Sequence, residues 1–210
     1  MSFSAVLFDF DGTLADSYDA IAASVNHVRE TRGLPPLAVD EVKWHVGRGP
    51  EYLLQRTVPS GEFAVDFPVY RQHHPKVMVP LTRLLPGARS ALESLHASKR
   101  RIGLCSNKPR IFSQELLKHL DIAPFFDVVI GPEDVPNPKP APDMLKTAIA
   151  RLNLAKEETL YVGDMVVDVQ TARGAGVTVW IVTTGSDELA TIEAAKPDRI
   201  LTSLEELTRL

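Results

Sequence analysis

Short apolar runs alternate along the chain with longer stretches in which apolar residues recur every three or four positions. The short runs have no polar alternate face, which is typical of strands that are buried on both sides of a parallel sheet. They occupy residues 3–8, 102–105, 128–130, 159–162, 177–182 and 200–201. The longer stretches have the spacing of amphipathic helices and occupy residues 88–96, 111–120, 144–152 and 167–175. This alternation predicts an α/β fold, a doubly wound parallel sheet with helices on both faces.

One segment interrupts the alternation. Between residues 15 and 81 the pattern contains no convincing strand. Helical patterns occupy residues 21–32, 39–46, 51–58 and 63–79, separated by proline and glycine pairs. An all-helical block that follows the first strand of a parallel sheet indicates an inserted cap. We therefore expect a helical cap domain at residues 15–81 and a core formed by residues 1–14 and 82–210.

Composition narrows the class of protein. The chain has 210 residues, of which 44% are hydrophobic, and this is typical of a globular protein. A formal net charge of −4 gives no support to nucleic-acid or anionic-membrane binding. The first residues lack the basic start of a secretory signal, and the single cysteine, Cys105, suits a reducing compartment. We expect a cytoplasmic protein, a monomer or a homodimer, without membrane or nucleic-acid partners.

Acidic residues follow two of the predicted strands. Asp9 and Asp11 precede Gly12 after the first strand, and Asp164 and Asp168 follow the strand at 159–162. In a parallel sheet the carboxyl ends of the strands share one edge, where ligands bind. An isolated Asp-x-Asp-Gly could be a solvated acidic turn, and Asp168 could simply stabilise a helix N-terminus. Two acidic strand ends together are better explained by a shared Mg²⁺ ion.

Hydroxyl, amide and ammonium groups follow other predicted strands. Ser106 and Asn107 end the strand at 102–105 and precede a helix, whose N-terminal N–H groups attract anions. Lys139 lies between prolines in a stiff loop. Helix capping and an ordinary surface lysine are the alternatives. On the residues alone, these groups could receive an anion at the same edge of the sheet.

Together these four segments resemble the motifs of the haloacid dehalogenase-like hydrolase superfamily. The nucleophile motif matches residues 9–14, the hydroxyl motif Ser106, the lysine motif Lys139, and the acidic motif Asp164 with Asp168. The order of the motifs is right, and the helical-cap subgroup, which includes phosphoglycolate phosphatase-like enzymes, is the most similar. The resemblance implies a Rossmann-like core and a phosphatase that acts on a small phosphorylated metabolite.

The resemblance also implies roles for the site residues. Asp9 would attack the phosphorus and form an aspartyl-phosphate, and Asp11 would be the general acid and base. Mg²⁺ would be held by Asp9, Asp164 and the backbone carbonyl of Asp11, and Asp168 would orient a metal-bound water or Lys139. Ser106, Asn107 and Lys139 would bind the phosphate group. A β-phosphoglucomutase-like isomerase shares the same intermediate and stays open as an alternative. A catalytically idle binding protein is a third reading, which the retained acidic positions disfavour.

Three further expectations concern single residues. Arg48, between two glycines in the cap, could pair with a carboxylate of the substrate or could be an ordinary surface arginine. Cys105 lies in an apolar strand and is expected to be a core thiol. His73 and His74 in the cap are expected to face solvent.

Overall fold

Six strands form one parallel sheet in the computed structural model, which describes residues 3–210. The strand order is β5-β4-β1-β6-β7-β8. The strands are β1 (Ala5–Phe8), β4 (Arg101–Cys105), β5 (Val128–Ile130), β6 (Thr159–Gly163), β7 (Thr178–Val182) and β8 (Arg199–Leu201). All six apolar runs therefore form strands. This confirms the predicted α/β fold with a doubly wound sheet.

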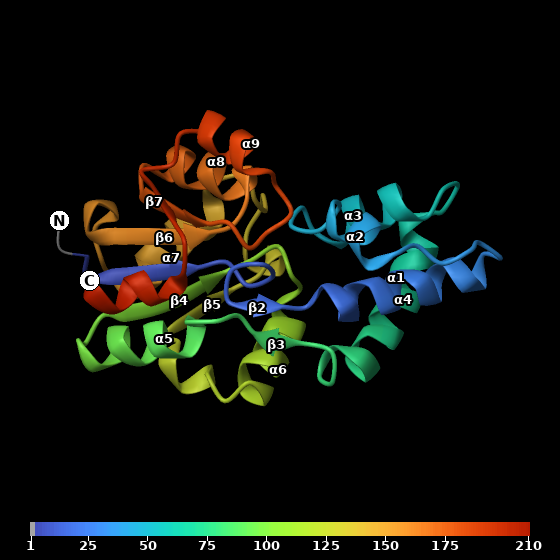
Figure 1. Cartoon of the computed structure of the whole chain (residues 1–210), viewed down its shortest axis with the longest axis horizontal. Coiled ribbons are helices and arrows are strands. Elements are labelled where there is room, and N and C mark those ends of the chain that lie inside the picture. Colours follow the sequence, from blue (N-terminus) through green and yellow to red (C-terminus); the bar gives the residue numbers. More distant parts are fainter. Residues whose placement is uncertain (1–2) are drawn as a thin grey trace.

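The sheet is buried on both faces because successive side chains of each strand enter different cores. In β1, Val6 and Phe8 belong to one hydrophobic cluster, whereas Ala5 and Leu7 belong to the other. Helices α5 (Ala88–Ala97) and α6 (Arg110–His119) contribute to the first cluster. Helices α7 (Asp143–Leu152), α8 (Val166–Ala175) and α9 (Leu189–Ala194) contribute to the second. Figure 1 shows α5 and α6 on one side of the sheet and α8 and α9 on the other.

Short 3₁₀ helices occur in the loops that connect the strands and helices around the sheet, and at the C-terminus. They are η1 (Ala123–Phe125), η2 (Pro132–Asp134), η3 (Lys156–Glu158) and η4 (Leu204–Arg209). Leu204 and Leu207 of η4 are buried in the same cluster as α5. None of these short helices, nor α9, is evident in the hydrophobic pattern, because each is too short to show a helical period.

Four helices lie together beyond one end of the sheet, at the right of Figure 1. They are α1 (Tyr18–Thr31), α2 (Val39–Lys43), α3 (Pro50–Thr57) and α4 (Phe63–Met78), and they are called here the helical segment. All four match helical patterns in the sequence, although α2 ends at Lys43 instead of continuing to residue 46. The helix α4 packs along α1 and contains Pro68 and Pro75.

A small antiparallel pair joins the helical segment to the sheet layer. The strand β2 (Ala15–Asp16) pairs with β3 (Arg83–Leu84), so that the chain leaves and returns side by side. The expectation that residues 15–81 contain no strand is therefore wrong at Ala15–Asp16. A two-residue strand is too short to produce an alternating pattern. Within residues 3–210 no helix combines the length and apolar character needed to cross a membrane.

Candidate active site

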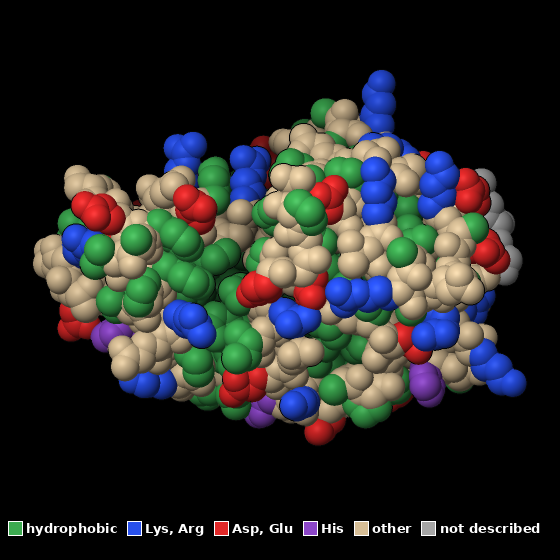
Figure 2. Space-filling view, turned by 180° about the vertical axis from the view of Figure 1, so that it is seen from behind, with side chains coloured by type: hydrophobic (Ala, Val, Ile, Leu, Met, Phe, Trp, Pro, Cys, Tyr) green, Lys and Arg blue, Asp and Glu red, His purple; other side chains and the backbone are tan. Residues whose placement is uncertain are grey.

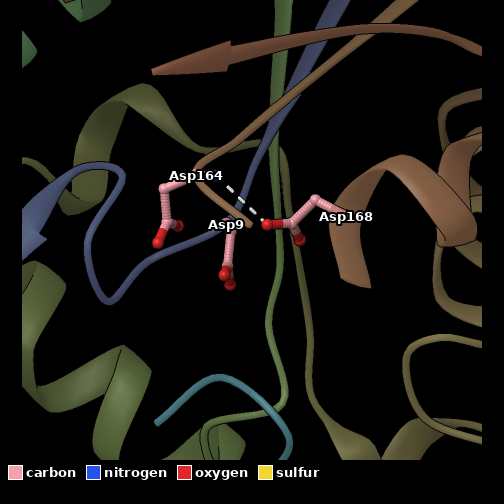
Figure 3. A group of neighbouring side chains, drawn as sticks. All are labelled: Asp9, Asp164 and Asp168. Carbon is pink, nitrogen blue, oxygen red and sulfur yellow. Dashed lines mark hydrogen bonds between the residues drawn. The ribbon is translucent and has the colours of Figure 1, made fainter. Parts of the chain in front are cut away.

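Three carboxylates meet at the carboxyl edge of the sheet. Asp9 directly follows β1, Asp164 directly follows the adjacent strand β6, and Asp168 lies in the first turn of α8. All three side chains are buried, and one oxygen of each lies within 4.8 Å of the others. Figure 3 shows them converging from these three elements. The structure thus brings together the two acidic motifs, 150 residues apart, that the sequence placed at one edge.

Both oxygens of Asp168 already have hydrogen-bond donors. Oδ1 lies 2.8 Å from Lys139 Nζ and accepts a hydrogen bond from the Tyr161 hydroxyl at 2.9 Å. Oδ2 accepts from the backbone N–H groups of Asp164 and Met165, both at 3.1 Å. Asp168 therefore stabilises the start of α8 and orients its neighbours at the same time. It has no oxygen left to bind a metal ion directly.

Asp9 and Asp164 differ from Asp168 because each has an unpaired oxygen. Within the described chain, Asp9 Oδ1 and Asp164 Oδ2 are buried and have no hydrogen-bond partner. Burial raises the pKa of Asp9 to about 6 although Lys139 opposes the shift. Burial, followed by the charges of Asp168 and Asp9, raises the pKa of Asp164 well above its usual range. Unpaired oxygens on two neighbouring carboxylates fit a hard divalent cation, which takes oxygen ligands.

The turn after Asp9 allows this close approach. Thr13 Oγ1 donates to Asp164 Oδ1 at 2.6 Å and fixes that carboxylate. Gly12 has a φ of 83°, and a Cβ atom there would lie 2.5 Å from Asp164 Oδ2. A larger residue would therefore collide with the carboxylate, which explains why glycine occupies this position.

Lys139 supplies the positive charge beside these carboxylates. Its Nζ lies 2.9 Å from Asp9 Oδ2, 2.8 Å from Asp168 Oδ1 and 3.1 Å from the Tyr161 hydroxyl. Burial alone would lower the pKa of Lys139, but Asp168 and Asp9 raise it above its usual range. The ammonium therefore stays charged next to Asp9. The surface-lysine alternative is excluded because the side chain is 0% exposed.

Ser106 and Asn107 line the same site from the end of β4. The Ser106 hydroxyl lies beside Asp9 and lowers the pKa of that carboxyl. The amide of Asn107 is occupied by backbone groups: Nδ2 donates to the carbonyls of Gly47 and Lys139, and Oδ1 accepts from Lys139 N–H at 3.0 Å. Asn107 thus fixes the Lys139 loop and touches the helical segment.

Lys108 is a site residue that the sequence reasoning missed. Its Nζ lies 3.0 Å from Asp11 Oδ1 and 3.3 Å from Asp11 Oδ2, and its side chain is 4% exposed. The Ser17 hydroxyl donates to the same carboxylate. The only signal in the sequence was the position of Lys108 directly after Ser106 and Asn107. Tyr161 was also missed, because a tyrosine within an apolar strand is indistinguishable from a core residue.

A cavity, called here the central cavity, lies between these groups and the helical segment. The side facing the sheet contributes Asp9, Asp11, Ser106, Asn107, Lys108, Pro109 and Phe112. The helical segment contributes Ile21, Val46, Gly47, Gly49, Pro50, Leu53, Tyr70 and His74. Charged groups thus lie at one end and apolar side chains at the other. Figure 2 shows that hydrophobic side chains also gather on the outer face near the junction of the two parts.

Arg48 does not line the central cavity. Its guanidinium lies over the ring of Tyr52, 5.1 Å from the centroid, and its side chain is exposed. The residue borders a neighbouring hollow together with Gly49, Asn107 and Pro138. Its neighbours Gly47 and Gly49 do line the central cavity, so the loop reaches the site while the Arg48 side chain points elsewhere.

Two of the remaining expectations have clear outcomes. Cys105 is buried, and burial raises the pKa of its thiol, so the core-thiol interpretation is confirmed. The expectation of solvent exposure is wrong for His74, which is 0% exposed. Tyr70, His74 and Met78 recur every four residues on α4 and form its buried face. His73, next to them, is half-buried.

Comparison with known proteins gives consistent matches over nearly the whole chain. Residues 6–182 match the family model described as haloacid dehalogenase-like hydrolase. A phosphoglycolate phosphatase of Cereibacter sphaeroides is 37% identical over 189 residues, which cover 86% of this chain and 85% of that protein. A phosphoglycolate phosphatase of Nitrosospira multiformis is 32% identical and covers 98% of this chain and 94% of its own length.

Solved structures show the same architecture. A haloacid dehalogenase-like hydrolase from Bacteroides fragilis has a TM-score of 0.89 at 34% identity, covering 98% of this chain and 100% of its own. A protein from Haemophilus somnus 129pt, called a predicted phosphoglycolate phosphatase, has a TM-score of 0.90 at 26% identity, covering 100% of this chain and 98% of its own.

Proposed function

Because the chain belongs to the haloacid dehalogenase-like hydrolase family, we propose that it is a Mg²⁺-dependent phosphatase of a small phosphomonoester. One observation carries this proposal: Asp9 Oδ1 and Asp164 Oδ2 are buried without partners beside the ammonium of Lys139. Two open carboxylate oxygens would hold the cation, and a cation with an ammonium group would attract a phosphate dianion. The names of the curated relatives make phosphoglycolate the first substrate to examine.

Asp9 is the proposed nucleophile. One of its carboxylate oxygens bonds to the phosphorus while the bond from phosphorus to the leaving oxygen breaks, which leaves an aspartyl-phosphate. Asp11, which must enter this step protonated, gives its proton to the leaving alkoxide. A water molecule then attacks the phosphorus and passes a proton to Asp11, and the bond between Asp9 and phosphorus breaks. Phosphate is released, and both carboxyl groups return to their starting forms.

The surrounding groups stabilise the charge that moves in these steps. Lys139 and Ser106 lie beside Asp9 and would hold the phosphoryl oxygens. Asp168 keeps Lys139 charged and in place. Mg²⁺ bound by Asp9, Asp164 and the Asp11 carbonyl would neutralise the repulsion between carboxylate and phosphate. Asn107 completes the phosphate-binding loop, through the backbone contacts that fix Lys139.

We also propose that residues 15–81 act as a cap over a core formed by residues 1–14 and 82–210. The support is the central cavity, whose walls come from both parts, and the β2–β3 pair, through which the chain enters and leaves the helical segment. Opening of the cap would admit the substrate, and closing would exclude bulk water. Arg48 remains a proposed specificity residue of this cap, since its loop reaches the cavity.

Phosphate release tests the proposed function. The purified protein is expected to release inorganic phosphate from p-nitrophenyl phosphate and from a panel of phosphorylated metabolites with Mg²⁺, and to stop when EDTA is added. Absence of turnover on the whole panel contradicts the proposal. A requirement for a sugar bisphosphate, with phosphoryl return to sugar instead of release to water, would favour the mutase alternative.

A further inference from the structure

One histidine of the helical segment lines the central cavity but has no part in the steps above. His74 is carried by α4, is 0% exposed, and shares the cavity with Asp9 and Asp11. Buried polar atoms in proteins are nearly always hydrogen-bonded. The partners of its two ring nitrogens therefore indicate which group His74 could recognise.

The contacts of Nδ1 place the hydrogen of the ring on that nitrogen. Nδ1 lies 2.9 Å from Ser24 Oγ, which also lies 3.3 Å from His73 Nδ1. Ser24 Oγ donates its hydrogen to the Ala20 carbonyl at 3.0 Å, because that oxygen can only accept. A hydroxyl has a single hydrogen, so the Ser24 oxygen accepts a hydrogen bond from His74. This contact therefore requires hydrogen on Nδ1.

The second nitrogen, Nε2, is consequently an acceptor. Burial lowers the pKa of His74 to about 2, and the charges of Lys108 and His73 lower it as well, so the ring is neutral. A neutral imidazole with hydrogen on Nδ1 has a lone pair on Nε2. Within residues 3–210, Nε2 is buried and has no hydrogen-bond partner. It is a buried acceptor without a donor, on a residue that lines the central cavity.

Tyr70 places a donor on the same wall. It lies one helical turn before His74 on α4, lines the central cavity, and stacks on His74 with ring centroids 5.0 Å apart. Burial, followed by the charge of Asp11, raises the pKa of the Tyr70 hydroxyl above its usual range, so it keeps its hydrogen. An acceptor beside a donor matches a hydroxyl group, which donates one hydrogen bond and accepts another. A carboxylate has no hydrogen to donate, and its charge would face the Nε2 lone pair.

We propose that His74 is a specificity-determining residue whose Nε2 accepts a hydrogen bond from a hydroxyl group on the leaving group of the substrate, with Tyr70 as the neighbouring donor. The proposal rests on the phosphatase function proposed above and narrows its substrate class. The proposal predicts that phosphomonoesters of polyols, such as glycerol-like or sugar-like phosphates, are better substrates than phosphoglycolate.

Three esters with two-carbon leaving groups test the proposal because they differ only at the far end. They are 2-hydroxyethyl phosphate, ethyl phosphate and phosphoglycolate, which end in a hydroxyl, a methyl and a carboxylate. The wild-type kcat/KM is expected to be at least about tenfold higher for the hydroxyl ester than for either of the others, as for sites that hydrogen-bond a substrate hydroxyl. His74→Leu is expected to bring the hydroxyl-to-methyl ratio close to one.

His73→Leu is the matched control. His73 is the neighbouring residue on α4, is half-buried, and does not line the central cavity. Its Nδ1 lies 3.3 Å from the Ser24 hydroxyl that contacts His74, so the control removes a neighbour of that hydroxyl and leaves the cavity wall intact. Its substitution is expected to leave the hydroxyl-to-methyl ratio at the wild-type value. If His74→Leu does not fold, His74→Gln replaces it: its amide oxygen can still accept, and the ratio is expected to stay above one.

A spectroscopic measurement tests the premise without turnover. The ¹⁵N chemical shifts of the His74 ring are expected to report the neutral form with hydrogen on Nδ1 between pH 6 and 8. Hydrogen on Nε2, or a charged ring, overturns the proposal. So does an active wild-type enzyme that shows no preference for the hydroxyl ester, or that favours phosphoglycolate. If the wild type fails to hydrolyse p-nitrophenyl phosphate with Mg²⁺, the phosphatase function itself fails, and the two failures are thereby distinguished.

Discussion

The ammonium group of Lys108 lies 3.0 Å from Oδ1 of Asp11 inside the central cavity. Lys108 follows β4 and Asp11 follows β1, and these two strands are neighbours in the sheet. The contact therefore joins two separate loops at the edge where the reaction is proposed to occur. It holds the carboxylate that would carry the proton in both steps.

Loss of Lys108 is expected to slow turnover because Asp11 would lose its ionic partner and its fixed direction. Lys108→Met should lower kcat for an alkyl phosphate by about 10- to 100-fold, less than the roughly 10²- to 10⁴-fold that a general acid–base group itself contributes, because Asp11 is misplaced and not removed. Lys108→Arg should restore part of the loss. Lys146→Met, at an exposed lysine of α7, is the control and should leave kcat unchanged. A Lys108→Met enzyme with wild-type kcat contradicts the positioning role.

Asp164→Asn tests the cation site. At Mg²⁺ about 100-fold above its Kd, binding should stabilise the wild type by about 2.7 kcal/mol and raise its Tm by several degrees. Asp164→Asn should lose this dependence, because one of the two open oxygens is gone. Without Mg²⁺ the variant should melt at or above the wild type, since an amide is free of the burial cost and charge repulsion that raise the pKa of Asp164.

Asp121→Asn is a matched control for that experiment. Asp121 is exposed and has a φ of 52°, a conformation that asparagine also tolerates. Differential scanning fluorimetry with and without Mg²⁺ should give the wild-type shift for this variant. An Asp164→Asn protein that keeps the full Mg²⁺-dependent shift would rule out the proposed ligand set.

Asp168 is expected to matter for stability as well as for activity. Asp168→Ala removes the acceptor of Lys139, of Tyr161 and of two backbone N–H groups, all in the buried interior. Breaking a buried ion pair by removing one partner costs about 3–5 kcal/mol in free energy of unfolding. Asp168→Asn should cost less because its amide oxygen can still accept. Urea denaturation measures both, and a loss under about 1 kcal/mol for Asp168→Ala would argue against this role.

Asp198 gives a pH-dependent prediction far from the reaction. Its carboxylate lies 2.8 Å from Arg173 Nη1 and accepts a hydrogen bond from Val179 N–H, joining α8 to β7. Partial burial alone would raise the pKa of Asp198, but these hydrogen bonds hold it below its usual value of 3.8. A lowered carboxyl pKa adds stability that is present above 3.8 and is lost as the pH falls through the lower folded-state value.

Asp198→Asn should therefore reduce the free energy of unfolding by about 1 kcal/mol at pH 7, a modest loss because the pair is partly exposed. The difference between wild type and variant should shrink below about pH 4. Denaturation curves from pH 7 to pH 3 provide the measurement. A difference that stays constant over this range is inconsistent with the lowered pKa.

The strands and the acidic edge could be predicted because they depend on short-range pattern. Buried parallel strands must be apolar on both faces, so runs such as residues 102–105 stand out. Once the sheet is parallel, residues after its strands share one edge, and this places Asp9 beside Asp164. Neither inference needs knowledge of how side chains pack.

The contacts that the sequence did not reveal depend on packing between distant segments. His74 is buried because α4 packs along α1, and no local pattern separates it from the half-buried His73. The contact between Lys108 and Asp11 forms only if the loops after β4 and β1 extend equally far beyond the sheet, and the sequence does not show how far they extend. The Arg48 side chain stacks on Tyr52, one helical turn further along the chain, and therefore does not line the central cavity. The type of residue does not determine which rotamer an arginine adopts, so the sequence could not predict this.

Asp9 is the nucleophile in the proposed reaction, and its replacement is the most direct test. With Mg²⁺ and p-nitrophenyl phosphate, Asp9→Asn should lose roughly 10⁴-fold or more in kcat, as for other enzymes that lose a covalent catalytic group. The circular dichroism spectrum should match the wild type, which separates lost chemistry from lost folding. An Asp9→Asn protein that folds and hydrolyses the ester at the wild-type rate would contradict the proposed mechanism.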